Sequence, residues 1–290
     1  MRNVLFGLLF AMLWASAAVA TKIGVAEAHP LLLANVRFFI AGGLMLFYVY
    51  VISPVKNVLP RGAEWLHLFI FSLLNTTIYL GAFVLALKEV SAGIGSLSTA
   101  TNPLFITLLS SVWLRRPLRL QEGLGIFLGL VGVALATYPL LQNSYATLKG
   151  LLILMAGMIS VSAATVYFAQ VNWRLSSLVI NGWQVLFGGI CLLPFTLCLT
   201  NIHTAHLNTN FWGSVFWLIG PVSILSLQLW FYLVKQDAVR ASLWLFLCPF
   251  FGFLYSFTLL GEPITAYTFA GTVLVIIGLY LAQYKKLNSR

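Results

Sequence analysis

The sequence repeats itself at one constant spacing. Seven small, aromatic or helix-breaking residues between positions 92 and 136 recur 146 positions later, between 238 and 282. Leu-rich segments resemble one another by chance, but two prolines and two glycines that keep a single offset indicate an internal duplication. The first copy carries Ala92, Ser96, Pro103, Phe105, Pro117, Gly125 and Gly132, and the second carries Ala238, Ser242, Pro249, Phe251, Pro263, Gly271 and Gly278.

The composition places the chain in a membrane. Hydrophobic residues make up 61% of the 290 positions and charged residues 8%, whereas a soluble domain carries about 25% charged residues. A spanning helix needs about 20 apolar residues, so the chain has room for ten helices and no soluble domain. Breaks at proline, charged and polar clusters predict an all-α integral membrane protein with spans at 4–21, 31–52, 65–87, 91–113, 121–138, 149–170, 177–199, 211–234, 239–260 and 264–284.

The duplication extends through both halves of the chain. Arg37, Gly42 and Trp65 stand 147 positions before Gln184, Gly189 and Trp212, and a one-residue gap near Val90 reconciles the two offsets. We therefore expect two repeats of five helices, over residues 1–140 and 147–285. An odd number of spans makes the second repeat enter from the opposite side, so the repeats are predicted to be inverted.

The positive charge follows membrane sidedness. The net charge is +10, but the basic residues form no aromatic-interleaved patch of the kind that binds nucleic acid. We expect the lipid bilayer and a small-molecule substrate as partners, and no nucleic acid. With a cytoplasmic N terminus, the far side receives Lys22, Lys88 and Lys149, and the cytoplasmic side receives Arg2, Lys56, Arg61, Arg115, Arg116, Arg119, Arg174, Lys235, Arg240, Lys285, Lys286 and Arg290. This bias predicts that both termini are cytoplasmic.

Enzymatic and metal-binding motifs are missing from the sequence. It has no phosphate-binding Walker loop, dinucleotide fingerprint, nucleophile elbow or zinc-protease motif. Cys191, Cys198 and Cys248 fall inside apolar runs, and His203 and His206 have no third ligand nearby. We expect no catalytic residue, no metal and no cofactor, and hence not an enzyme.

Two prolines lie near the middle of equivalent spans. Pro103 and Pro249 each remove a backbone hydrogen bond, so each is expected to kink its helix. The kinks serve either packing alone or a central cavity, because a freed carbonyl in a bilayer must face protein or water. In the cavity interpretation Thr101 and Asn102 offer hydrogen bonds.

Arg37 is the one cation placed well inside a span. A buried guanidinium is costly and is normally paired. Two roles remain open: a structural one, with loop carbonyls or with Glu27 or Glu89 as partner, and contact with a substrate carboxylate or phosphate. All six carboxylates fall near span ends, so coupling through a carboxylate at the bilayer centre is not expected, while a helix-end group such as Glu262 remains open.

Aromatic and amide residues supply the other cavity candidates. Tryptophan and tyrosine near span ends are usually interfacial anchors, which is the competing interpretation for each. Glycines of the fifth and tenth spans predict close helix contact, internal or between protomers, in a monomer or a homodimer. The further candidates are Trp14, Asn75, Tyr79, Tyr167, Gln170, Trp183 and Gln228.

Several of these motifs together resemble a known family. They are Trp14-Ala15-Ser16 with Lys22 and Arg37-Phe38, the segment 92–103, Arg116-Pro117, Gly261-Glu262-Pro263, and the glycine-rich helix that closes each half. In this order and in two copies they are similar to the EamA repeats of the drug/metabolite transporter superfamily. The resemblance implies a ten-helix carrier of the inner (plasma) membrane, usually an exporter of small metabolites such as amino acids. Such a carrier works by alternating access, with helices 1, 3, 4, 6, 8 and 9 around the cavity. Arg116 where the second half has Glu262 departs from the commoner pattern.

The sequence therefore favours a transporter of a small polar or amphipathic metabolite. A passive channel-like facilitator is the first alternative, although no charged ring or carbonyl filter motif supports it. A membrane enzyme or a lipid-handling subunit is the second alternative, and it would need a polar catalytic cluster.

Overall fold

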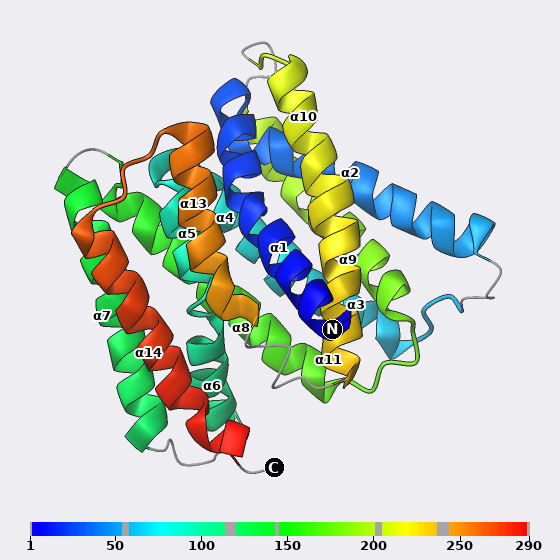
Figure 1. The fold of residues 1–290 in the computed structure, drawn as a ribbon. Coiled ribbons are helices and arrows are strands. Elements are labelled where there is room, and N and C mark those ends of the chain that lie inside the picture. Colours follow the sequence, from blue (N-terminus) through cyan, green and yellow to red (C-terminus); the bar gives the residue numbers. More distant parts are fainter. Residues whose placement is uncertain are drawn as a thin grey trace.

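The computed structural model describes residues 2–53, 58–113, 120–142, 145–200, 205–236 and 244–288. Within these ranges the regular structure is helical, apart from one isolated antiparallel bridge between Val90 and Ala146. Figure 1 shows the helices gathered in a single bundle. The all-α prediction is confirmed.

The first half of the chain contributes helices α1 to α7. Their bounds are α1 Arg2–Glu27, α2 Pro30–Phe47, η1 Tyr48–Ile52, α3 Ala63–Ser72, η2 Leu73–Ile78, α4 Tyr79–Glu89, α5 Ala92–Thr99, α6 Asn102–Trp113 and α7 Leu120–Gln142. The second half contributes α8 Leu148–Gln170, α9 Ser177–Leu199, α10 Thr209–Trp217, η4 Leu218–Ser226, α11 Leu227–Gln236, η5 Trp244–Leu247, α13 Cys248–Leu260 and α14 Ala266–Asn288.

Seven helices in the described ranges are long and apolar enough to cross a membrane. They are Val4–Glu27, Pro30–Ile52, Ala63–Glu89, Leu120–Gln142, Leu148–Gln170, Ser177–Leu199 and Thr209–Trp230. Cys248–Leu260 and Ala266–Gly278 are shorter apolar helices. The chain is thus a multi-pass helical membrane protein, and ten spans in two inverted repeats remain a prediction.

Polar side chains start many of these helices. In each case the residue before the helix accepts a hydrogen bond from the backbone N–H three positions on, which satisfies a donor that has no partner inside the helix. The capping residues are Ser91 for α5, Thr147 for α8, Ser176 for α9 and Asn208 for α10.

The two prolines expected to kink spans instead lie in the first turns of helices. The chain turns at Ala100 and Thr101 between α5 and α6, and Pro103 is the second residue of α6. Pro249 is the second residue of α13, directly after the 3-10 helix η5. A proline is tolerated there because the first-turn N–H has no intrahelical partner, and the regular α-helix of each span is interrupted just before its proline.

Two π-helical segments occur at equivalent places in the duplication. The segment η2 covers Leu73–Ile78, and η4 covers Leu218–Ser226. Adding the offset of 147 to the bounds of η2 gives residues 220–225, which lie inside η4. Segments of this kind widen the helix locally and are frequent at functional sites.

Glycines bring α7 and α14 into direct backbone contact (Figure 1). A Cβ atom added to Gly271 would lie 2.3 Å from the carbonyl oxygen of Gly132, and one added to Gly278 would lie 2.5 Å from that of Gly125. Gly125 and Gly132 are the repeat equivalents of Gly271 and Gly278. The Gly271–Gly132 contact and the Gly278–Gly125 contact are therefore equivalent by the repeat. The expected glycine interface lies within the chain.

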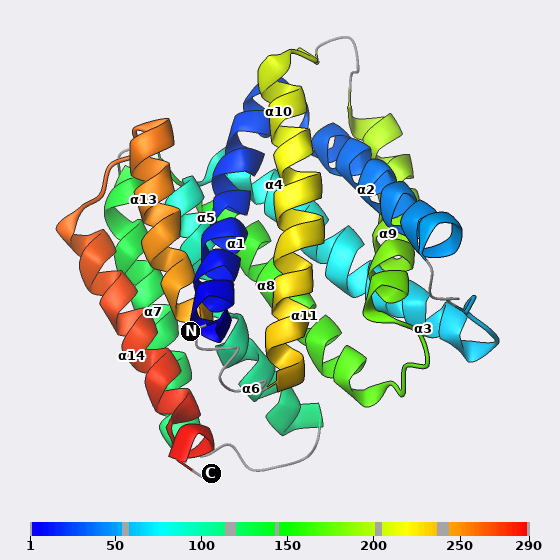
Figure 2. The same cartoon turned by 45° about the vertical axis from the view of Figure 1, so that its right-hand side comes forward.

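The other helix contacts also come in repeat-related pairs. Helix α2 packs on α9, its own counterpart in the second half. Helix α1 packs on η4 and α13, while its counterpart α8 packs on η2 and α6, the counterparts of η4 and α13. Figure 2 shows α7, α13 and α14 on one side of α1 and α10, with α2, α3 and α9 on the other.

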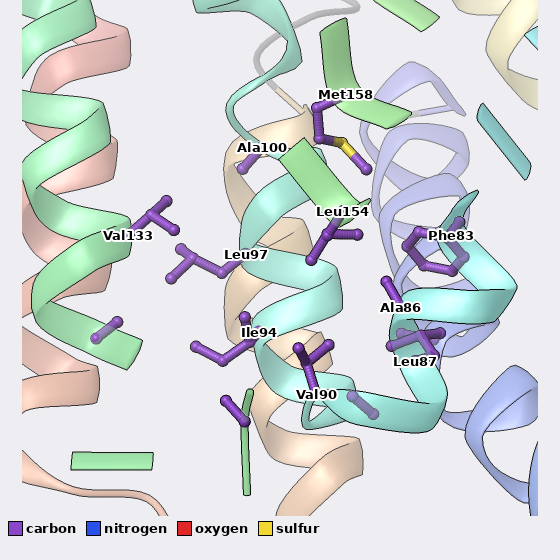
Figure 3. Packing of buried hydrophobic residues seen from close by; sticks show 14 of the residues in the cluster. Phe83, Ala86, Leu87, Val90, Ile94, Leu97, Ala100, Val133, Leu154 and Met158 are labelled. Carbon is purple, nitrogen blue, oxygen red and sulfur yellow. The ribbon is translucent and has the colours of Figure 1, made fainter. Parts of the chain in front are cut away.

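An apolar core joins α4, α5 and α7 of the first half to α8 of the second half. Leu97 and Ile94 of α5 face Val133 of α7, and Phe83, Leu87, Leu154 and Met158 fill the space toward α4 and α8 (Figure 3). Ala86, Ile94 and Leu97 have no exposed surface. Burying such side chains contributes about 1.5–3 kcal/mol for each large one, although helix association within lipid depends mainly on packing.

Candidate functional site

A small, partly open cavity lies between helices of the first half and η4 of the second half. Its volume is about 30 Å³, which is enough to hold water. The walls come from α1, α2, α4, α5 and η4. The lining residues are Trp14, Ala17, Ala18, Arg37, Tyr79, Leu80, Phe83, Ser96, Thr99 and Val222.

Arg37 supplies the charge of this cavity. Arg37 is buried, with only 7% of its surface exposed. Nε and Nη2 donate to Oγ of Ser223 at 3.2 and 2.9 Å, and the guanidinium carbon lies 5.8 Å from the centre of the Phe38 ring. Glu27 and Glu89, the two proposed counter-charges, bind other groups: Glu27 accepts from Asn208 and Asn210, and Glu89 accepts from Thr147 and Lys149.

The remaining walls are aromatic or aliphatic, with two hydroxyl groups. Trp14 of α1 and Tyr79 and Phe83 of α4 provide the rings. The hydroxyl of Ser96 donates to the carbonyl of Ala15, and that of Thr99 donates to the carbonyl of Ser96. Both hydroxyl protons are thus used within the protein, while their oxygens can still accept a hydrogen bond.

Three of the predicted cavity residues, Trp14, Arg37 and Tyr79, line this cavity. Asn75 does not: its amide donates to Oε1 of Gln184 at 3.1 Å. Thr101 is buried and bonds the carbonyl of Ser98 in the turn before α6. Asn102 begins α6, and its buried Oδ1 has no hydrogen-bond partner among the described residues.

The other four predicted residues also lie elsewhere. Tyr167 contacts Nδ1 of His67 at 2.7 Å through its hydroxyl. Gln170 is exposed at the end of α8. Trp183 donates to the hydroxyl of Tyr50 at 3.2 Å, and Gln228 stands in α11 with its Nε2 atom buried and unbonded among the described residues.

The cavity also contains residues that the sequence analysis did not select. Phe83, Ser96, Thr99 and Val222 line it. Ser96 was visible as part of the repeat, but apolar Phe83 and Val222 carry no signal that separates a cavity wall from ordinary core. The helices around the cavity also differ from the expected set: the second expected span contributes Arg37, and the described residues of the expected sixth and ninth spans do not line it.

Next to the cavity, a buried polar network holds η2 against α9. Oε1 of Gln184 accepts from Asn75 and from the hydroxyl of Thr76 at 2.5 Å, and Nε2 of Gln184 donates to Asn181 at 2.9 Å. The amide of Asn181 in turn donates to the carbonyl of Ser223 at 3.4 Å. The network therefore ends on the residue that binds Arg37.

One end of the bundle is closed by a carboxylate at a helix N terminus. Glu262 accepts from the backbone N–H of Ala92 at 2.9 and 3.0 Å and from that of Gly93 at 3.4 Å. Ser256 also bonds this carboxylate. A negative group at this position is stabilised by the unpaired first-turn donors and by the helix dipole.

The chain turn at Gly261 positions Glu262. Gly261 has a φ of 65°, the left-handed conformation that glycine adopts readily, and its N–H bonds the carbonyl of Phe257. The N–H of Glu262 then bonds the carbonyl of Ser256. Arg116, the counterpart of Glu262, lies outside the described residues, as do Arg115, Arg119, Pro117, Asp237, Ala238, Ser242 and His203.

At the opposite end, Arg174 joins the second half to the first. Its guanidinium contacts Glu64 at 2.9 Å and donates to the carbonyl of Leu59. The hydrogen bond to Glu64 raises the pKa of Arg174 above its usual value. Among the described residues, no group of three His, Cys, Asp or Glu side chains could hold a metal ion.

A polytopic helical bundle with a small cavity between its helices is an architecture that membrane transport proteins share. The comparisons with known proteins agree. A model of the EamA-like transporter family matches residues 1–138 and again 148–284, so the chain belongs to that family. An uncharacterized transporter of Archaeoglobus fulgidus is 27% identical over 275 residues, which cover 94% of this chain and 95% of the relative.

Two bacterial relatives have similar lengths. The uncharacterized transporter YoaV of Bacillus subtilis is 25% identical, with 98% of each chain covered. The uncharacterized inner membrane transporter YedA of Escherichia coli is 26% identical, with 97% of this chain and 93% of the relative covered. One crystal structure matches at a TM-score of 0.67 and 20% identity over the whole of this chain, which establishes a shared fold.

Proposed function

We propose that this protein is a carrier that exports a small metabolite across the inner membrane by alternating access between two inverted five-helix repeats. The observation that carries the proposal is the small size of the cavity between the helices. A volume of about 30 Å³ is too small for a metabolite, so the helices around it must separate for binding, as in a carrier. A passive pore would instead need a continuous opening.

The repeat-related contacts support inverted repeats. The two glycine contacts between α7 and α14 are equivalent by the repeat, and the contacts of α1 in the first half are equivalent to those of α8 in the second. The start of α1 and the end of α14 lie toward the same end of the bundle (Figures 1 and 2). An even number of spans places both termini on one side.

The contacts of the charged residues support the sidedness. Lys22 donates to the carbonyl of Val90, next to Glu89, which binds Lys149. These residues belong to the end that is predicted to face away from the cytoplasm. Arg174 and Glu64 meet at the other end. A fluorescent reporter fused to the C terminus should therefore be active in the cytoplasm; activity only of a periplasmic reporter would contradict this topology.

Counterflow in proteoliposomes tests the transport function. Purified protein is reconstituted into liposomes loaded with an unlabelled metabolite pool, and uptake of labelled members is measured. A carrier gives saturable uptake that is stimulated by its own substrate inside. Protein-free liposomes and a variant at the lipid-facing surface, Phe269→Ala (70% exposed), are the controls. Flux that neither saturates nor shows counterflow would favour the channel alternative.

A further inference from the structure

We propose that Arg37 binds the anionic group of the substrate, and that this group is a carboxylate on a body without a cationic group. The inference rests on the proposed function, because it names the chemical class that the carrier moves. It narrows the broader expectation of an amino acid or related amphipathic compound.

The first observation is that the buried guanidinium has donors to spare. It carries five N–H groups, and two of them bond one atom, Oγ of Ser223. Three N–H groups are left without a hydrogen-bond partner among the described residues, and no carboxylate there forms an ion pair with Arg37. These donors belong to a side chain that lines the cavity.

The repeat allows Arg37 to be compared with the residue at the equivalent position of the second half. Gln184 is the repeat equivalent of Arg37, and Thr76 is the equivalent of Ser223, each 147 residues apart. The Arg37–Ser223 bond and the Gln184–Thr76 bond are thus the same contact in two copies. Only the residues around them differ.

Both polar atoms of the Gln184 side chain have hydrogen-bond partners, whereas Nη1 of Arg37 has none among the described residues. Gln184 has two further partners, Asn75 and Asn181. The equivalents of these partners beside Arg37 are Val222 and Ala34, neither of which has a polar side chain. Arg37 therefore carries a charge at a place where, among the described residues, the hydroxyl of Ser223 is its one side-chain acceptor. A buried charge without a partner is costly, and an anionic ligand removes that cost.

The geometry of the remaining donors favours a carboxylate. Ser223 occupies the Nε side of the guanidinium, which leaves both hydrogens of Nη1 and one of Nη2. Two of these lie at the outer end of the planar group, where they form a fork that matches the two oxygens of a carboxylate.

The cavity walls determine the rest of the ligand. Trp14, Tyr79, Phe83 and Val222 present rings and an aliphatic chain, which suit an apolar body. None of the ten lining residues is acidic, so an ammonium group would meet Arg37 without a carboxylate to balance it. Amines are excluded by this argument, and a zwitterion binds less tightly than the matching acid.

Four compounds with one phenylethyl body test the inference. They are 3-phenylpropanoate (anion), phenylalanine (zwitterion), 2-phenylethylamine (cation) and 3-phenylpropanamide (neutral). The thermal stability of the purified protein is measured with each at equal ionic strength, because a ligand that binds the folded state raises apparent stability with its occupancy. We expect a clear shift with 3-phenylpropanoate, a smaller one with phenylalanine, and none with the other two.

Variants separate binding from folding. In Arg37→Gln the affinity for 3-phenylpropanoate should fall by about 30-fold or more, as when a buried charge pair loses a partner. Arg37→Lys keeps the charge but loses the forked pair of donors, so its affinity for 3-phenylpropanoate should lie between those of the native protein and Arg37→Gln. The matched control is Gln184→Ala, at the equivalent place in the other repeat: it should lower the starting stability and leave the preference for the acid intact.

The comparison among the four compounds on the native protein stands even if both Arg37 variants fail to fold. No shift with 3-phenylpropanoate, or an equal shift with the amine or the amide, overturns the inference. If the inference fails in this way but other solutes show counterflow, the proposed transport function remains valid without an anion-binding role for Arg37. If the acid binds through Arg37 but no solute shows counterflow, the anion site stands and the transport function fails.

Discussion

Replacing Glu262 should loosen the contact between the two halves of the protein at the N terminus of α5. All the first-turn donors of this helix have partners. Glu262 takes the N–H groups of Ala92 and Gly93, while Ser91 takes that of Ile94 through its side chain. Glu262 is 7% exposed, so water cannot readily replace it.

The size of the effect follows from these bonds. A hydrogen bond to a charged group contributes about 1.5–3 kcal/mol, and the Gly93 bond is long. Removing the side chain in Glu262→Ala also leaves the buried Ala92 N–H unpaired, so we expect a loss of about 2–4 kcal/mol. Glu262→Gln keeps one acceptor without the charge and should lose about half as much.

The assay is the unfolding free energy in detergent micelles, measured by titration with a denaturing detergent. Glu89→Gln is the matched control, because Glu89 bonds Thr147 and Lys149 at the surface, where such pairs contribute about 1 kcal/mol or less. Equal losses in Glu262→Ala and Glu89→Gln would refute the argument that Glu262 holds the helix terminus.

Two further perturbations have defined outcomes. Gly271→Leu should prevent the close packing of α7 and α14, since its Cβ would meet the backbone of Gly132 at 2.3 Å, and we expect the free energy of unfolding to fall by more than about 1–3 kcal/mol. The control Gly43→Leu lies in open space and should fold normally. Equal yields of the two variants in size-exclusion chromatography would contradict this prediction. The His29 ring accepts from the N–H of Leu31 only when neutral, and burial followed by the nearby charge of Lys88 lowers its pKa below 6.5. The stability from this hydrogen bond is thus fully present above pH 6.5 and lost as the pH falls through the lowered pKa. In His29→Asn the unfolding free energy should therefore decrease less as the pH is lowered below 6.5. The same decrease in the variant and the native protein would contradict a capping role for His29.

The sequence was most informative where the duplication restricts backbone contact. Glycine at one offset in two helices predicted close packing, because only a missing Cβ allows two backbones to approach, and the contacts of Gly271 and Gly278 have that form. The prolines located the interruptions of two spans. How the helices are interrupted there was not predictable, because the turn at Ala100 and the 3-10 helix η5 have no separate signal in the sequence.

The cavity was only partly predictable. Arg37 stood out because a cation inside a span is rare. Asn75 was equally polar, yet it faces Gln184, and the sequence does not show whether a buried polar group has a partner in the fold. Phe83 and Val222 are apolar residues of ordinary appearance, and their place in the wall depends on which face of each helix meets its neighbours.

Accessibility of the cavity from the two sides of the membrane tests alternating access most directly. Thr99 lines the cavity, so Thr99→Cys is introduced after replacement of the three native cysteines, and a membrane-impermeant thiol reagent is applied to right-side-out and inside-out vesicles. The account predicts labelling from each side, with rates that change in opposite directions when a transported solute is present on one side. Labelling from one side only, or from neither, would contradict it.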